Sequence, residues 1–133
     1  MKRLPVVAGL IRIGRKILLA RRPENKKRGG LWEFPGGKVE EGEPLEEALA
    51  RELAEELGIK VKVERSLTQI EYDYPDVSVC LFCFACKIVE GKPHPLEGQE
   101  LGWFLPEEIE TLALAPADFL LWQEVKEIIP LQS

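Results

Sequence analysis

The sequence is poor in the residues that most often bind transition metals or form disulfide bonds: its 133 residues include one histidine and three cysteines. An odd number of cysteines in a chain without an export signal argues against a disulfide framework. Cys80, Cys83 and Cys86 lie in an apolar run rich in strand-forming residues. Because side chains alternate between the faces of a strand, Cys83 should point away from the other two, which would lie ~20 Å apart. We therefore expect buried cysteines and no zinc site.

The sequence also lacks an excess of positive charge and any long apolar run. Its 18 Lys and Arg against 23 Asp and Glu give a formal net charge of −5, which argues against a protein that grips a nucleic-acid duplex through its phosphates. No apolar segment approaches the ~20 residues that span a bilayer, and the start does not resemble a cleavable signal. We expect a cytoplasmic protein, with no membrane or duplex partner, that folds as a single domain over residues 1–133.

Strand-forming runs separated by turn residues occupy much of the chain. The runs 4–13 and 16–20 flank Gly14 and predict a hairpin, while Pro35-Gly36-Gly37 predicts a turn. Further strands are predicted at 61–63, 67–72, 77–89 and 101–104, with a turn at 74–76, a short helical turn from Pro106, and a closing helix over 117–129 that ends at Pro130.

A helix is predicted between Pro44, which suits the first helical position, and Gly58, which suits the position after the last turn. Leucines at every fourth position between them form an apolar face for packing onto a sheet. The other side carries Glu52, Glu55 and Glu56, whose like charges repel one another, and the helix dipole disfavours anions near this end. A bound hard cation would reverse that repulsion, whereas a solvated acidic face is the simpler alternative.

The spacing of the surrounding residues favours the cation. Five residues separate Gly37 from Glu43, seven more precede Arg51, and the sequence then reads Arg51-Glu52-Leu53-Ala54-Glu55-Glu56-Leu57-Gly58-Ile59. This pattern resembles the Nudix box in full. The resemblance implies an α+β fold, an α/β/α sandwich in which a mixed sheet lies between helices and the box forms a loop-helix-loop. It also implies hydrolysis of a nucleoside diphosphate linked to a further group.

The resemblance assigns a metal site and a general base. It implies that Glu52, Glu55 and Glu56 hold Mg²⁺, for which Mn²⁺ could substitute, with help from the backbone carbonyl of Gly36. Glu52 is the first candidate for the base that accepts a proton from the attacking water. Glu97 is a second candidate and a further metal ligand, because MutT-like members carry such a glutamate in a similar Glu-Gly-Gln context. An exposed loop acid is the alternative interpretation of Glu97.

Other residues of the box would support these carboxylates. The resemblance implies that Arg51 takes part in catalysis by orienting the carboxylates through a charge-assisted hydrogen bond. Glu43 would brace the loop against the helix, and Gly37 and Gly42 would shape that loop.

Segments outside the box resemble the MutT-like nucleoside triphosphate pyrophosphohydrolases over nearly the whole chain. This likeness places Arg22 near the nucleotide, Phe34 in the lining of the base pocket and Asp118 against the base edge. The matching segments are 21–23, 32–38, 72–76 and Leu114-Ala115-Pro116-Ala117-Asp118.

Asp118 leaves the preferred base open. MutT carries Asn at this position, with one donor and one acceptor, whereas an ionised Asp only accepts and so favours the amino group of cytosine or adenine. The tail around Asp118 also resembles the CTP pyrophosphohydrolase branch. A protonated Asp118 in an apolar pocket could still donate to an oxidised purine. The remaining alternative is an Asp118 that only caps the last helix.

Together these features predict an Mg²⁺-dependent enzyme that converts a (deoxy)nucleoside triphosphate to the monophosphate and pyrophosphate. The leading hypothesis is clearance of oxidised or otherwise modified nucleotides, as by an 8-oxo-dGTP diphosphatase. Within the family, the alternatives are hydrolysis of CTP or modified dCTP, and of ADP-ribose or dinucleoside polyphosphates. A non-catalytic nucleotide-sensing Nudix module is the alternative from another class, although such modules can lose glutamates that this chain keeps. We expect a monomer or a homodimer.

Overall fold

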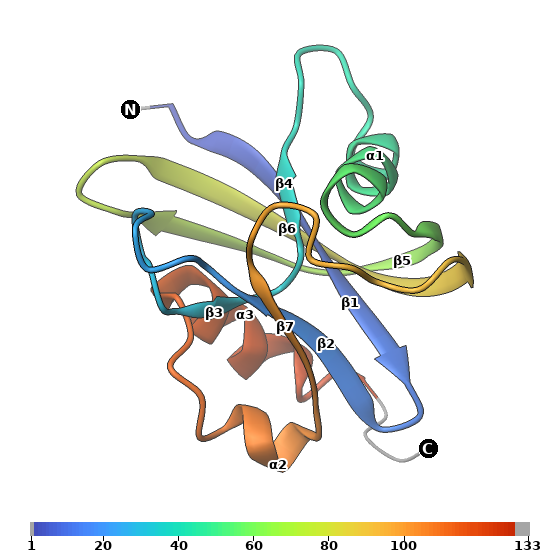
Figure 1. The fold of residues 1–133 in the computed structure, drawn as a ribbon. Helices are drawn as coiled ribbons and strands as arrows, with labels where there is room; N and C mark the ends of the chain where they lie inside the picture. Colours follow the sequence, from blue (N-terminus) through green and yellow to red (C-terminus); the bar gives the residue numbers. More distant parts are fainter. Residues whose placement is uncertain (1, 130–133) are drawn as a thin grey trace.

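A mixed β-sheet lies between helices in the computed structural model, which describes residues 2–129 (Figure 1). The chain runs through β1 (Leu4–Ile13), β2 (Lys16–Arg21), β3 (Trp32–Glu33), β4 (Gly36–Lys38), α1 (Leu45–Leu57), β5 (Lys60–Asp73), β6 (Ser78–Glu90), β7 (Glu100–Phe104), α2 (Pro106–Ile109) and α3 (Pro116–Val125).

The long strand β1 organises the sheet because it pairs with three other strands. The strand order is β3-β2-β1-β6-β5, with β4 on β1 and β7 on β2. Residues Leu4–Ile11 of β1 run parallel to Val79–Cys86 of β6. The first half of β1 also pairs antiparallel with β4, and its last two residues pair antiparallel with β2. The predicted mixed sheet is therefore confirmed.

Successive residues of β1 supply the two cores of the sandwich. Val7 and Ile11 pack with the leucines of α1, whereas Ala8 and Leu10 pack with α3 on the other face. Figure 1 shows α1 on one side of the sheet and α2 and α3 on the other. Each fully buried leucine of α1 contributes about 1.5–3 kcal/mol relative to an exposed one, so the apolar stripe fixes which face of α1 is left for the glutamates.

The cysteines follow the predicted alternation along β6. Cys83 is buried in the core beneath α3, and Cys86 is buried in the core beneath α1. Burial raises the pKa of the Cys83 thiol and, to about 12, that of Cys86. The three cysteines are free, and both of the buried pair are inert apolar residues by this geometry.

The prediction of a turn at residues 35–37 was wrong, because Gly36–Lys38 forms β4 and pairs with Val6–Ala8. A Cβ atom on Gly36 would lie 1.9 Å from the Val7 carbonyl oxygen, so the missing side chain is what permits this close pairing. The predicted strands at 61–63 and 67–72 are likewise one strand, β5, whose register shifts against β6 absorb the residues between them.

Two helix ends differ from the predicted ones. Helix α1 begins at Leu45, and Pro44 is its N-cap rather than its first residue, while Gly58 ends the helix with a φ of 70° as predicted. Helix α3 runs from Pro116 only to Val125. The apolar pattern predicted a longer helix because Ile129, which follows a turn after α3, is also buried. The predicted stop at Pro130 lies outside the described residues.

Within residues 2–129, no helix is long and apolar enough to cross a membrane.

Candidate active site

Arg51 on α1 connects the preceding loop to two of the box glutamates. Its guanidinium donates two hydrogen bonds to the Glu43 carboxylate, at 2.8 and 3.0 Å, and a third to the Lys38 carbonyl oxygen at 3.0 Å. It also donates to Glu52 and to Glu55, each at 3.3 Å. The bond from Arg51 is the main reason that the pKa of Glu43 is lowered. Arg51 thus contacts two of the carboxylates that it is predicted to orient, and Glu43 bridges loop and helix.

Gly37 and Gly42, the two glycines predicted to shape the loop, are required for different structural reasons. A Cβ atom on Gly37 would lie 2.3 Å from the Glu52 carboxyl carbon, so the backbone of β4 can approach this glutamate only without a side chain. Gly42 has a φ of +77° with open space around it, so its turn requires the left-handed backbone that glycine adopts at least cost.

Glu56 is a buried carboxyl group among other acids. It is 8% exposed, and the Gly36 N–H donates to its carboxylate. Burial, followed by the charges of Glu33 and Glu97, raises the pKa of Glu56 to about 8. An ionised Glu56 would lie near several negative charges, and among the described residues no positively charged side chain is a main influence on its pKa. The oxygen-only chemistry of this cluster therefore fits a hard divalent cation.

A cavity of about 390 Å³ lies beside this cluster. Its lining includes Glu33, Glu56 and Glu97, the backbone of Gly36, and the basic side chain of Arg22. Of the predicted metal ligands, the structure brings Glu56, Glu97 and Gly36 to this cavity, whereas Glu52 and Glu55 bond to Arg51. Among the described residues no group of three or more His, Cys, Asp or Glu side chains is already arranged to hold a metal ion.

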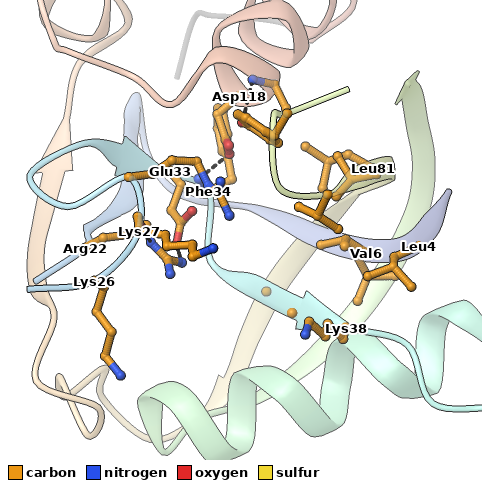
Figure 2. Close-up of a pocket in the computed structure, with 18 of the residues that line it drawn as sticks. Leu4, Val6, Arg22, Lys26, Lys27, Glu33, Phe34, Lys38, Leu81 and Asp118 are labelled. Carbon is orange, nitrogen blue, oxygen red and sulfur yellow. Dashed lines mark hydrogen bonds and ion pairs between the residues drawn. The ribbon is translucent and has the colours of Figure 1, made fainter. Parts of the chain in front are cut away.

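A second, larger cavity of about 490 Å³ extends from the acidic cluster towards α3. Figure 2 shows Glu33, Phe34 and Asp118 at one end and Leu4 and Val6 across from them. A pocket of this volume with mixed polar and apolar walls is of the size that holds a small organic ligand. The Phe34 ring is buried and packs against Trp122, with 6.4 Å between ring centroids.

Asp118 lies at the α3 end of this cavity, in the first turn of that helix. Its Oδ1 accepts the Phe34 N–H at 2.9 Å, and the residue is 7% exposed. Burial, and next the charge of Glu33, raises the pKa of Asp118 well above its ordinary value. The helix-cap alternative is wrong, because α3 begins at Pro116 with Ala115 as its N-cap and has no side-chain cap bond.

Glu33 is the functional candidate that the sequence analysis missed. It lines both cavities and bonds to Arg22 at 3.3 Å, and Arg22 lines both cavities too. Burial raises the pKa of Glu33 although Arg22 opposes the shift. An acid between Trp32 and Phe34, two large apolar residues in a strand-like segment, is the sequence signal that could have identified it.

Tyr74 joins the turn between β5 and β6 to the start of α3. Its hydroxyl accepts the Ala117 N–H at 2.9 Å, and the Arg28 guanidinium lies 4.3 Å from its ring centroid. Arg28 also pairs with Asp76 at 3.1 Å. Because α3 has no side-chain N-cap bond, Tyr74 supplies the acceptor that a cap would otherwise provide.

We expect Tyr74→Phe to destabilise the protein by about 1–3 kcal/mol, because the Ala117 N–H loses its acceptor in a half-buried position. Urea unfolding measures this change. Tyr72→Phe is the matched control, since its ring lies beside that of Tyr74, with 4.7 Å between centroids. Equal stability of the two variants would show that the Tyr74 hydroxyl does not cap α3.

The fold agrees with the comparison to known families. The chain belongs to the NUDIX domain family, whose profile matches residues 2–123, and it is a Nudix hydrolase. The resemblance stated from the sequence is therefore confirmed, and so is the α/β/α fold that it implied. Members of this family generally use a divalent metal ion.

Curated relatives cover most of the chain. It is 41% identical to the CTP pyrophosphohydrolase of Escherichia coli over 91% of this chain and 90% of that protein. It is 38% identical to the 8-oxo-dGTP diphosphatase of the same organism over 77% of this chain and 81% of that protein. Among solved structures, the MutT protein of Methanosarcina mazei is 28% identical with a TM-score of 0.83, covering 96% of this chain and 97% of that one. The curated relatives thus include both the CTP pyrophosphohydrolase branch and the 8-oxo-dGTP diphosphatase branch that the sequence resembles.

Proposed function

We propose that the protein is an Mg²⁺-dependent pyrophosphohydrolase that converts a (deoxy)nucleoside triphosphate to the monophosphate and pyrophosphate, and that it removes oxidised or otherwise modified nucleotides. The relative named 8-oxo-dGTP diphosphatase supports this class of substrate. The proposal requires one site for a phosphate chain and a neighbouring one for a base.

The observation that carries the proposal is that the two cavities share a wall. Arg22, Lys26, Glu33 and Gly36 line both of them. A nucleotide with its base beside Asp118 would extend its phosphates past Arg22 and Lys26 towards Glu56 and Glu97. The two cationic side chains suit the phosphates, and the acids beyond them suit a cation shared with those phosphates.

Glu52, Glu55, Glu56, Glu97 and the Gly36 carbonyl would hold the metal ion. When bound, Mg²⁺ would supply neutralising charge for the phosphates and orient a water molecule. Arg51 keeps the carboxylates of Glu52 and Glu55 directed along one face of α1.

Glu52 is the candidate base. Burial raises the pKa of Glu52 towards neutral pH. A carboxylate whose pKa lies nearer the working pH accepts a proton more readily. As the water oxygen bonds to phosphorus, its proton passes to Glu52 and the bond from phosphorus to the bridging oxygen breaks. The products are the monophosphate and pyrophosphate. The raised pKa also means that the rate should fall as acid protonates this carboxylate.

Cytosine nucleotides are the second candidate substrate. The presence of Glu33 beside Asp118 favours them, because two carboxyl groups offer acceptors for the N4 amino group. The relative named CTP pyrophosphohydrolase supports this alternative.

A panel of kcat/KM values with Mg²⁺ tests the proposal: 8-oxo-dGTP, dGTP, CTP, 5-methyl-dCTP, 5-hydroxy-CTP and ADP-ribose, with products identified by chromatography. Monophosphate and pyrophosphate from a triphosphate are the expected products. Preference for 8-oxo-dGTP over dGTP would indicate the first candidate, and preference for the cytosine compounds the second. Release of two monophosphates from ADP-ribose, or no turnover of any nucleotide, would overturn the proposal.

A further inference from the structure

The loop that carries Glu97 is attached to the C-terminal end of α1. The last carbonyl oxygens of a helix have no partner within the helix and need one from elsewhere. Here the Leu57 carbonyl accepts the His94 N–H at 3.0 Å, and the Glu56 carbonyl accepts the Leu96 N–H at 3.2 Å. The loop therefore completes the helix end, and in doing so it comes to lie beside the residue that bears the buried Glu56 carboxyl group.

Gln99 makes the bridge between the two acidic residues themselves. Its Nε2 donates to the Glu56 carbonyl oxygen at 3.3 Å, while its Oε1 accepts the Glu97 N–H at 2.9 Å. The residue is 9% exposed, although the five residues before it, 94–98, are exposed. One amide side chain thus uses both its donor and its acceptor to join the backbones of Glu56 and Glu97.

A glutamine is well suited to this bridge because a carboxylate could accept but not donate, and an ammonium could donate but not accept. Gly98 allows the loop to turn between Glu97 and Gln99, with a φ of +78°. Glu97 is exposed, and its backbone N–H bond to Gln99 adds to the bond from Leu96 in holding it near Glu56. Gln99 lines the same cavity as both acids.

We propose that Gln99 is a positioning residue that holds Glu97 and Glu56 at the spacing that a divalent cation requires. This inference rests on the proposed metal-dependent function of the same site. Residues that orient metal ligands without touching the metal typically change metal affinity or activity by about 10–100-fold when replaced. Gln99 acts through Glu97 and through the end of α1, so its loss should weaken cation binding even when no nucleotide is present.

The test is the Mn²⁺ affinity of Gln99→Met, measured without nucleotide by the electron paramagnetic resonance signal of free Mn²⁺. Met keeps the length and volume of the side chain but makes neither hydrogen bond. We expect the Mn²⁺ Kd to rise about tenfold or more, and kcat with Mg²⁺ to fall by a similar factor. Gln123→Met on α3 is the matched control and should leave both values unchanged. Gln99→Asn, one methylene shorter, cannot span both partners and should behave like Gln99→Met even if the Met variant folds poorly.

The outcomes separate the two proposals. If the wild-type protein neither binds Mn²⁺ nor hydrolyses nucleotides, the proposed function fails. If the wild-type protein does both, and folded Gln99 variants keep its Mn²⁺ Kd and kcat within twofold, Gln99 has a structural role only and the inference is wrong. A lower melting temperature with unchanged Mn²⁺ affinity would lead to that same conclusion.

Discussion

Replacement of Glu56 by Gln is expected to reduce turnover on the order of 10²–10⁴-fold without loss of the fold. Glu56 is more buried than Glu52 and Glu55, and it lines the cavity that Glu33 and Glu97 also line. Its negative charge is what a cation would neutralise there, and Gln removes that charge. The Gln amide oxygen can still accept the Gly36 N–H that Glu56 accepts now. Steady-state hydrolysis with Mg²⁺, together with circular dichroism, measures both parts of the prediction.

The same substitution should remove a dependence of stability on pH. The pKa of Glu56 is about 8 in the folded protein, above its ordinary value of 4.5. The folded state therefore holds this proton more tightly than the unfolded state does, and the stability that this provides is full below pH 4.5 and is lost as the pH rises towards 8. We expect metal-free Glu56→Gln to be at least as stable as the wild type at pH 8, and Mg²⁺ to raise the melting temperature of the wild type more than that of the variant.

The exposed Glu47 in the first turn of α1 supplies the control. Glu47→Gln removes one negative charge from the same helix and should change neither turnover nor the pH dependence of stability. A Glu56→Gln enzyme with wild-type kcat would show that this carboxylate is not part of the catalytic site.

Much of this arrangement could be predicted from the sequence because it depends on local patterns. The leucine stripe of α1 fixes which face is buried, so the positions of Glu52, Glu55 and Glu56 follow from helical periodicity. The left-handed Gly58 at the end of α1 is likewise a local signal. These features need no knowledge of what the helix packs against.

Contacts between distant segments could not be predicted in this way. Gly36 and Gly37 look like a turn locally, yet pairing with β1 makes them a strand, because only glycine allows the Val7 carbonyl to come so close. Glu33 looks like an ordinary strand residue until the fold brings it between Arg22 and Asp118. The Glu-Gly-Gln segment drew attention to Glu97, but the hydrogen bond from Gln99 to Glu56 spans 43 residues and follows from no local pattern.

Asp118→Asn is expected to change which base is preferred by about 10–100-fold, with a smaller effect on kcat. Oδ1 of Asp118 accepts the Phe34 N–H, and the backbone N–H of Asp118 also donates to this carboxyl group, so at most one oxygen is left to face a base. In Asn the amide oxygen would keep the Phe34 bond and the amide nitrogen would take the other position. That group donates, whereas the ionised form of Asp118 only accepts, so the contrast with the wild type should be largest at a pH where Asp118 is ionised. The ratio of kcat/KM for CTP to that for 8-oxo-dGTP should therefore fall.

The pH dependence of the base preference shows whether the neutral or the ionised form of Asp118 contacts the base. Burial raises the pKa of Asp118, so its neutral form persists at a pH where an exposed aspartate is ionised. In the wild type, rising pH should shift preference from bases that accept a hydrogen bond to bases that donate one, and it should also lower stability as the buried acid ionises. In Asp118→Asn the shift in preference should disappear, and the fall in stability should be smaller than in the wild type because only Glu56 and Glu33 still contribute to it. The exposed Asp73, paired with Arg3 at the surface, gives Asp73→Asn as the control. If Asp118→Asn keeps the wild-type ranking of substrates at every pH, Asp118 does not determine which base is preferred, and other groups that line the cavity, such as Glu33, must do so.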